Sequence, residues 1–445
     1  MKKMLILLGV LLIAGSMNVF GAGGKQTAAA PANKELSILW SSGGNGDFVN
    51  YAVEKLRKDY GLDIDLEYNT QAHEILRPQI IAGNPPDIVM VQHGFFNYFE
   101  AIQQGAFTPI SKYLDLTVAD GGKKVIDVIG PELVDAMRVN GDAYILLSNV
   151  NVSGLYYDAK LFRDKGWRPP TTWDEFIALC DTIKRTEPGI APFIYPGMYP
   201  YYLDYFFMPN VMALGDGAKT MIQCNNMEKG IWSSGAVLGA AKRIQEMRDK
   251  GFFYNGLISL NHTAAQMEFI NRRAAMVCSG SWLDNEMAGN WPADFELTYL
   301  PAPTGLRASD ARYARMSGNL FGFPSAAKNK DYIDKFLQIY YSNESAERVA
   351  GETSVVISSS LVSTSPGVAR VLSKPVLDTY QKADNCIKYF SLYNMWYPEF
   401  YTELQNLLTA LVSGQINADE FCTRLEAKSE SIRNDSSVVK YSVGK

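Results

Sequence analysis

The sequence is poor in residues that bind metals or carry redox chemistry. Its 445 residues include three histidines (His73, His93 and His262) and five cysteines, with no C-x-x-C pair and no histidine pair at metal-ligand spacing. Five is an odd number, so at least one thiol stays free, and the spacings select no particular disulfide. Cys180 and Cys278 stand at apolar positions of an expected helix and an expected strand, which favours burial as small hydrophobic side chains. We therefore expect no metal ligands among these residues.

Basic runs and nucleotide-binding or catalytic motifs are also missing. The formal net charge is −5, and it becomes about −7 without Lys2 and Lys3, which lie in an expected leader. Lysine and arginine form no basic run that could follow a phosphate backbone, which argues against a nucleic-acid partner. The glycines of SSGGNG at 41–46 do not fit G-x-G-x-x-G, and no P-loop, G-x-S-x-G or H-E-x-x-H motif occurs. Neither a cofactor nor an enzymatic activity is expected.

The only long apolar run is at the N-terminus. Two lysines precede an apolar stretch from Met4 to Ala14, which is too short to span a bilayer, and small residues follow. This pattern predicts a signal peptide over residues 1–21, cleaved after Gly21, and then a flexible tether over 22–34. No cysteine lies near the cleavage point, so lipid attachment is not expected. The sequence thus predicts a soluble exported protein, periplasmic in location.

The first part of the chain alternates strand and helix patterns. Expected strands ELSILW (35–40), LDIDLEYN (62–69) and PPDIVMV (85–91) are separated by helical segments, the β-α-β-α-β order of a parallel α/β domain. The chain length favours two such domains. Ligands of these sheets bind beyond the carboxyl ends of the strands. The candidate residues after the first and third strands are Trp40, Ser41, Ser42, Asn45, Gln92 and His93.

Two further segments combine polar or aromatic residues with an unusual pattern. Asn149, Asn151 and Ser153 alternate with apolar residues, which is typical either of a strand that crosses a wet cleft or of a surface edge strand. The run PFIYPGMYPYYLDYFF (192–207) has eight aromatic residues among three prolines and a glycine. We expect it to be irregular, neither helix nor plain strand, and either a packed core corner or an aromatic ligand wall. Trp282, in a strand-to-helix turn, is expected to face a cleft.

In their order along the chain, several segments resemble the extracellular solute-binding proteins of bacterial ABC importers, in their sugar-binding, maltose-binding-protein-like branch. Together they cover most of residues 36–430. The matching segments are AGNPPDIVMVQ, FEAIQQGAFTPIS, NGDAYILLSNVNVSGLYYDAKLF, GWRPPTTWDEF, FINRRAAMVCSGSW, LPAPTG, MSGNLFGFPSAAKNKDYIDKFLQIY and MWYPEFYTELQNLLTALVSGQINADEF.

The resemblance implies a fold of two discontinuous α/β lobes joined by crossing hinge strands, as in type II periplasmic binding proteins. The N-terminal lobe would comprise 35–148 plus 321–372, and the C-terminal lobe 152–315 plus 373–440. The hinges would lie near 149–152 and 316–320. The implied partners are a carbohydrate ligand and an inner-membrane ABC permease, and we expect a monomer.

The resemblance also implies which side chains bind the sugar. Aromatic rings would cover the apolar faces of pyranose rings, while amides would bind the hydroxyl groups. Gly44 and Gly94 stand where the family carries acidic residues, which argues against a maltodextrin ligand. The implied sugar-binding residues are Trp40, Ser42, Asn45, Gln92, His93, Asn149, Asn151, Tyr199, Tyr202, Trp282, Gly318, Asn319 and Trp396.

Two alternative functions remain open from the sequence. A ferric-ion-binding protein of the same fold would use a tyrosine pair such as Tyr201-Tyr202, although the three histidines supply no clear further ligands. A secreted glycosidase would need two convergent carboxylates, for which Asp284, Glu286 and Glu399 are the candidates.

Overall fold

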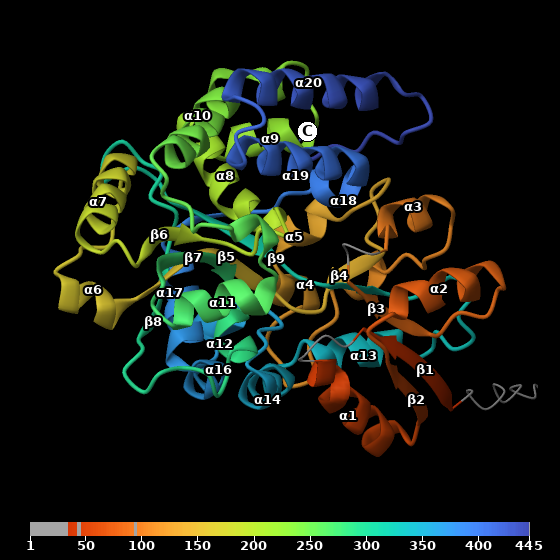
Figure 1. The fold of residues 1–445 in the computed structure, drawn as a ribbon. Coiled ribbons are helices and arrows are strands. Elements are labelled where there is room, and N and C mark those ends of the chain that lie inside the picture. The colour runs from red at the N-terminus through yellow and green to blue at the C-terminus, as the bar shows by residue number, and fades with distance from the viewer. Residues whose placement is uncertain (1–33, 42–45, 93–95, 445) are drawn as a thin grey trace, which may run out of the picture. The chain divides into compact units, whose positions relative to one another are not determined.

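The computed structural model describes residues 34–41, 46–92 and 96–444 (Figure 1). The predicted signal peptide, nearly all of the predicted tether, and the predicted site residues Ser42, Asn45 and His93 lie outside these ranges. The described chain forms two β-sheets with helices packed around them, which confirms the predicted α/β class. Within the described residues, no helix has both the length and the apolar character needed to cross a membrane.

The first sheet has the strand order β2-β1-β3-β10-β4. Strands β1, β2 and β3 are parallel, as predicted, and β10 is antiparallel to both β3 and β4. Its strands are β1 (Glu35–Trp40), β2 (Asp63–Tyr68), β3 (Ile88–Val91), β4 (Ile145–Leu147) and β10 (Leu320–Gly322). The helices between and after the parallel strands are α1 (Asn50–Tyr60), α2 (Ala72–Ile81) and α3 (Tyr98–Gln103).

The second sheet has the order β11-β9-β5-β7-β6, and β8 pairs with β5 outside this path. The central β5 is antiparallel to β7, β8 and β9. The strands are β5 (Asn151–Asp158), β6 (Ala191–Ile194), β7 (Ala274–Gly280), β8 (Leu297–Leu300), β9 (Tyr313–Ser317) and β11 (Ile387–Tyr389). Strand β11 is the only strand among the described residues after β10, and helices precede and follow it.

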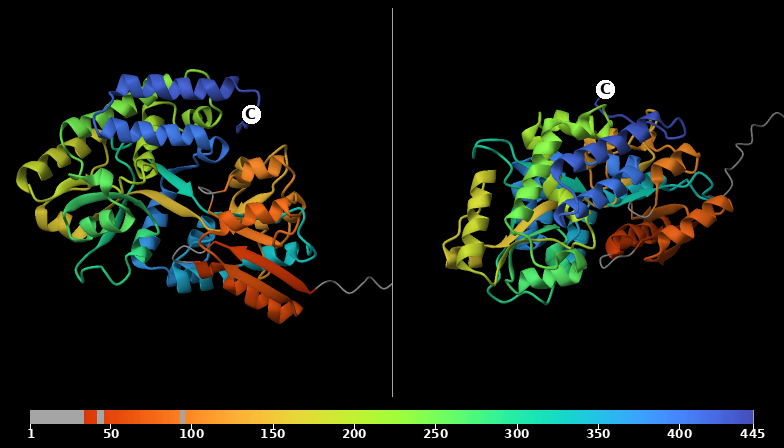
Figure 2. Two further views of the ribbon diagram at one scale, coloured as in Figure 1. Left: turned by 45° about the vertical axis from the view of Figure 1, so that its right-hand side comes forward. Right: turned by 45° about the horizontal axis from the view of Figure 1, so that its top comes forward.

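Helix α8 (Tyr201–Leu214) packs on β5, β7 and β9, and also contacts α10 (Gly235–Asp249). Figure 2 shows α10 beside the two long C-terminal helices, α19 (Pro398–Val412) and α20 (Ala418–Asn434). The other α-helices are α4 (Val125–Ile129), α5 (Pro131–Ala136), α6 (Ala159–Lys165), α7 (Trp173–Thr186), α9 (Ala218–Asn225), α11 (His262–Ile270), α12 (Leu283–Glu286), α13 (Ile333–Tyr340), α14 (Asn343–Thr353), α15 (Ser359–Thr364), α16 (Pro366–Val371), α17 (Lys374–Asp384) and α18 (Tyr393–Trp396). In the described ranges, short 3-10 helices span Gly46–Val49, Ser111–Tyr113, Ile231–Ser233 and Leu257–Ser259.

The aromatic run at 192–207 is more regular than its composition suggested. Its first residues belong to β6, and its second half forms the first two turns of α8, so the prediction of an irregular segment was wrong. Pro200 directly precedes the helix, where a missing backbone donor costs nothing. The prolines thus mark the turn between a strand and a helix instead of preventing both.

The chain passes between the two sheets at two adjacent places. It leaves β4 at Leu147 and enters β5 at Asn151, and it leaves β9 at Ser317 and enters β10 at Leu320. The two passages are bonded to each other, because Ser148 N donates to Asn319 O at 2.8 Å and Asn319 N donates to Asn149 Oδ1 at 3.0 Å.

The five cysteines all lie in the described part of the chain, and all are free thiols. Cys180 and Cys278 are fully buried, which confirms the prediction that both are buried side chains.

Candidate functional site

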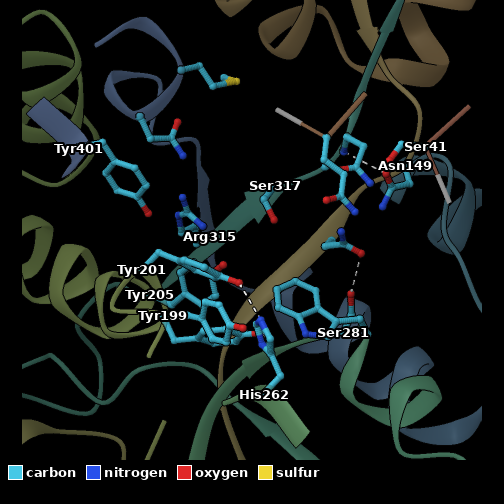
Figure 3. Close-up of a pocket in the computed structure, with 18 of the residues that line it drawn as sticks. Ser41, Asn149, Tyr199, Tyr201, Tyr205, His262, Ser281, Arg315, Ser317 and Tyr401 are labelled. Atoms are coloured by element: carbon cyan, nitrogen blue, oxygen red, sulfur yellow. Dashed lines mark hydrogen bonds between the residues drawn. The ribbon is translucent and has the colours of Figure 1, made fainter. Parts of the chain in front are cut away.

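A cavity of about 1090 Å³ lies beside the two passages between the sheets (Figure 3). Its wall combines the ends of strands from both sheets. The first sheet contributes Ser41 after β1 and Gln92 after β3. The passages contribute Asn149, Asn151, Ser317, Gly318 and Asn319. The second sheet and its helices contribute Tyr199, Tyr201, Tyr202, Tyr205, His262 and Trp282.

The cavity brings together most of the predicted site residues that the structure describes. Gln92 lies in its wall with the four predicted residues of the passages, namely Asn149, Asn151, Gly318 and Asn319. The predicted aromatic residues Tyr199, Tyr202 and Trp282 lie in the same wall.

Trp40 and Trp396 lie elsewhere. Trp40 is fully buried inside β1, where its ring packs against Phe48, Phe321 and Tyr340 at centroid distances of 5.6–6.0 Å. Its place in the cavity wall is taken by the next residue, Ser41, because successive side chains of a strand point to opposite faces. Trp396 is also buried, with its ring stacked on Tyr441 at 5.5 Å. The structure places both tryptophans in the core and not among the residues that line the cavity.

One wall of the cavity is a continuous aromatic cluster. The rings of Tyr199 and His262 stack with centroids 3.9 Å apart and planes inclined by 17°. The rings of Tyr201 and Tyr202 stack at 4.7 Å. Tyr199 and Tyr201 are half-buried, whereas Tyr202 is 2 % exposed and forms the base of the cluster.

His262 fixes two of these tyrosines through hydrogen bonds. Its Nδ1 lies 2.9 Å from the Tyr202 hydroxyl and its Nε2 lies 3.5 Å from the Tyr201 hydroxyl (Figure 3). Burial lowers the pKa of His262, which favours the neutral imidazole, with one nitrogen as acceptor and one as donor.

Trp282 completes the aromatic wall at the turn that follows β7. Its half-buried indole meets Tyr202 and Tyr205 edge-on, with centroids 6.1 and 6.3 Å away. A Cβ on Gly280 would lie 2.2 Å from the indole ring, so the ring occupies the space that the glycine leaves. The missing side chain at Gly280 therefore helps to set where the tryptophan lies.

The opposite part of the wall is formed by polar groups of the passages. Asn149 is 6 % exposed, and its Oδ1 accepts hydrogen bonds from Asn319 N and from Ser148 Oγ. Asn151 is half-buried, and its Oδ1 accepts from Ser281 Oγ at 3.4 Å. These bonds orient the amides and leave their NH₂ groups as donors at the cavity wall.

The buried arginine of the wall was missed by the sequence analysis, and Glu286 was named there only as a candidate carboxylate of the glycosidase alternative. Arg315, two positions before the end of β9, is 4 % exposed, and its guanidinium lies 4.5 Å from the centroid of the Tyr205 ring. Glu286 is exposed to the cavity, accepts a hydrogen bond from Gln266 Nε2 at 2.7 Å, and has a pKa raised by desolvation. Arg315 could have been suspected from its position just before the predicted second hinge. For His262 the sequence carried no signal beyond a helix start.

The two alternative functions receive little support from this geometry. Among the described residues that line the cavity, Glu286 is the only carboxylate, whereas a glycosidase pair needs two. Asp284 binds Ser373, and Glu399 lies near Lys428, outside the wall. Burial raises the pKa of Tyr201 and Tyr202, which disfavours the phenolates that a ferric ion would need.

Comparison with curated proteins gives relatives of moderate similarity. The diacetylchitobiose binding protein NgcE of Streptomyces coelicolor is 27% identical over 339 residues, which span 74% of this chain and 69% of that protein. The multiple sugar-binding protein of Streptococcus mutans is 22% identical over 283 residues, which span 62% of this chain and 64% of that protein, slightly less than two thirds of its length.

Comparison with solved structures supports the fold. The chitin oligosaccharide binding protein superposes with a TM-score of 0.69 at 19% identity, over 89% of this chain and 99% of that one. The apo form of RafE from Streptococcus pneumoniae superposes with a TM-score of 0.71 at 17% identity, over 90% of this chain and 98% of that one. At these identities the likeness establishes the architecture, which confirms the predicted fold of type II periplasmic binding proteins.

The family model of bacterial extracellular solute-binding proteins matches residues 40–347, well over half of the chain. The match begins in β1 and ends in α14, so it includes both passages between the sheets. The chain belongs to the bacterial extracellular solute-binding protein family.

Proposed function

We propose that the protein captures a sugar or oligosaccharide in the cavity beside the two passages and delivers it to the membrane permease of an ABC importer. The observation that carries this proposal is the pairing of an aromatic wall with a polar wall in one cavity. Pyranose rings have apolar faces and a rim of hydroxyl groups, so they are complementary to such a site. The sugar-binding relatives support the same assignment.

The cavity size favours an oligosaccharide over a single sugar ring. Its volume of about 1090 Å³ reaches the upper limit of small-molecule sites, which is roughly 1,000 Å³. A smaller cavity of about 290 Å³ shares the lining residues His262 and Glu286 with it.

We further propose that the protein works as a monomer of two lobes that close on the ligand by rotation at the passages. The N-terminal lobe would be 35–148 plus 321–372 and the C-terminal lobe 152–315 plus 373–440, with hinges near 149–152 and 316–320. The distribution of the strands between the two sheets supports these limits. Closure should lower the radius of gyration measured by small-angle scattering when a saturating sugar is added.

The N-terminal pattern and the family membership support a periplasmic location, reached through a cleaved signal peptide. The protein would act there as a carrier without catalytic activity, and its partner would be an inner-membrane permease that contacts both lobes.

The direct test is a thermal-shift screen of the mature chain against mono- and oligosaccharides, followed by calorimetry of the best ligand. A ligand that binds only the folded state raises the melting temperature. We expect micromolar or tighter binding of at least one oligosaccharide and no turnover of chromogenic glycosides. A flat response across neutral and charged sugars would refute the proposed function.

A further inference from the structure

A buried carboxylate lies beneath the cavity wall, next to its buried arginine. Asp204 of α8 is 0 % exposed and does not line the cavity, and its Oδ2 lies 4.0 Å from Nη2 of Arg315. Both of its oxygens accept from the Tyr393 hydroxyl, at 3.1 and 3.2 Å. Asp204 therefore supplies negative charge close to Arg315 without forming a hydrogen bond to it.

Arg315 keeps most of its donors available to the cavity. Its one hydrogen bond to another described residue is long, from Nε to Ser391 Oγ at 3.4 Å. Figure 3 shows its guanidinium between Tyr401 and the tyrosines of the aromatic wall, and it is one of the residues that line the cavity. A buried guanidinium cannot release its proton, so it needs a counter-charge and hydrogen-bond acceptors.

The position of the counter-charge determines what the site can accept. A hydroxyl oxygen of a sugar can accept from Arg315 without bringing charge into the cavity. A sugar carboxylate at the same place would be attracted by Arg315 and repelled by Asp204. The net attraction would then be too weak to compensate the free-energy cost of removing the carboxylate from water. Because the repulsion by Asp204 offsets part of the attraction by Arg315, the pair should discriminate against acidic sugars.

We propose that Asp204 is a specificity-determining residue that makes the cavity select uncharged sugars by neutralising Arg315 from outside the ligand's reach. This inference rests on the proposed sugar-binding function. It assigns to Asp204 a role in charge balance and in positioning Arg315, with no contact between Asp204 and the ligand.

The test compares neutral and acidic sugars of the same backbone. Calorimetry at pH 8 would use matched pairs such as galactobiose with digalacturonate, cellobiose with its glucuronate counterpart, and N-acetylglucosamine oligomers as further neutral ligands. In the native protein we expect each acidic sugar to bind at least about tenfold more weakly than its neutral partner. Asp204→Asn keeps the side-chain volume but removes the charge. In this variant we expect the ratio of the two Kd values, acidic over neutral sugar, to fall by about tenfold or more.

Tyr393→Phe is the matched control. It removes the two hydrogen bonds to Asp204 but keeps the carboxyl group, so at pH 8 the ratio should change much less than in Asp204→Asn. A role of Asp204 in packing alone would change both sugars equally in Asp204→Asn and leave their ratio constant.

A second measurement needs no substitution, in case Asp204→Asn fails to fold. Burial, opposed by Arg315 and Tyr393, raises the pKa of Asp204 to about 6, so acid neutralises this carboxylate in the native protein. Lowering the pH from 8 to 5 should therefore shift the ratio toward the acidic sugar, whose own carboxylate stays largely ionised. The ionisable groups that face Asp204 are Arg315, Tyr205, Tyr389, Tyr393, Tyr401, Cys224 and Cys278.

None of these neighbouring phenols and thiols titrates in this range, because burial raises the pKa of every one of them. Two groups of the cavity wall could also respond to acid, namely His262 and Glu286. Glu286→Gln and His262→Gln should each retain the pH-dependent shift of the ratio if Asp204 is its source.

The outcomes separate the two proposals. Acidic sugars that bind the native protein as tightly as their neutral partners, or a ratio unchanged in Asp204→Asn and between pH 8 and pH 5, would overturn the role of Asp204 while leaving sugar binding intact. If no sugar of either kind binds at millimolar concentration, the proposed function itself fails, and this inference fails with it.

Discussion

Trp282 lies edge-on to Tyr202, with ring centroids 6.1 Å apart and planes inclined by 70°. In edge-to-face packing of this kind, the edge of one ring contacts the face of the other, and one face of the indole stays available for contact with a ligand. Tyr205 meets the same indole at 6.3 Å and 77°. Two tyrosines of α8 thus position a tryptophan that follows β7, and the half-buried indole belongs to the cavity wall.

Trp282→Ala should weaken sugar binding while changing the unfolding free energy of the ligand-free protein little. Loss of an apolar stacking contact worth about 1.5–3 kcal/mol corresponds to a roughly ten- to hundredfold rise in Kd. Calorimetry and thermal melting of the same variant measure the two effects. A melting temperature that collapses while affinity is preserved would mean that the indole serves the core.

Gly280→Ala is a matched variant that keeps the indole but displaces it. A Cβ at this position would meet ring carbons of Trp282 at 2.2–2.5 Å, so the ring must move into the cavity or away from it. We expect an affinity loss similar in size to that of Trp282→Ala, accompanied by an altered tryptophan fluorescence spectrum. Unchanged affinity and fluorescence would show that the ring position is not set by this contact.

His262 should make the stability of the ligand-free protein depend on pH. Burial lowers its pKa in the folded state, so folding favours the neutral form. Its contribution is fully present above the unfolded pKa of about 6.5 and is lost as the pH falls below that value toward the lowered folded pKa. Chemical denaturation at pH 7.5, 6.5 and 5.5 measures the unfolding free energy. As the pH falls, this free energy should decrease less in His262→Gln than in the native protein. An identical decrease in both would assign the effect to other groups.

The parts of the site that were predictable from the sequence follow local rules. Strand β1 was predicted because alternation is encoded over a few residues. The alternation around Asn149 and Asn151 also fitted a surface edge strand, and only the family resemblance assigned these residues to a passage between lobes. The burial of Trp40 was not predictable, because it depends on which face of β1 receives Tyr340 from a helix some 300 positions later. Proximity of that kind arises only from the tertiary fold.

The same distinction explains the residues that were missed. Arg315, Asp204 and Tyr393 come from a strand and two helices that are distant in the sequence, and only packing brings their charges and hydroxyl groups together. The aromatic run shows the converse error. Its prolines suggested irregularity, yet Pro200 at the start of α8 and Pro209 inside it are compatible with a helix that tertiary contacts stabilise.

Gly318→Ala should disturb the passage between β9 and β10. A Cβ here would lie 1.9 Å from the carbonyl oxygen of Asn149 and 2.9 Å from Leu147, and a backbone atom cannot move aside as a flexible side chain can. We expect an unfolding free energy lower by about 1–3 kcal/mol, measured by urea denaturation. Gly235→Ala in α10 is the control, because nothing lies within 4 Å of its Cβ and alanine favours a helix. Equal stability of the two variants would contradict the tight approach of the two passages.

The C-terminal segment after α20 folds back and contacts several earlier helices. Backbone groups of Val443 bond to both ends of the Asn226 amide, at 2.8 and 3.0 Å, and the ring of Tyr441 stacks on Trp396. The same ring meets Phe99 of α3 at 5.3 Å. Phe99 follows β3 of the first sheet, so Tyr441 links helices that pack around different sheets.

Tyr441→Ala should therefore affect both stability and ligand binding. Removal of a half-buried ring with three aromatic neighbours, Phe99, Trp396 and Tyr397, should lower the unfolding free energy by about 1–2 kcal/mol. If this contact belongs to the closed arrangement of the two lobes, its loss also disfavours closure, and the Kd for sugar should rise severalfold. Tyr441→Phe keeps the ring and should match the native protein in both measurements. Should Tyr441→Ala lose stability with the Kd unchanged, the C-terminal segment would stabilise the fold without taking part in closure.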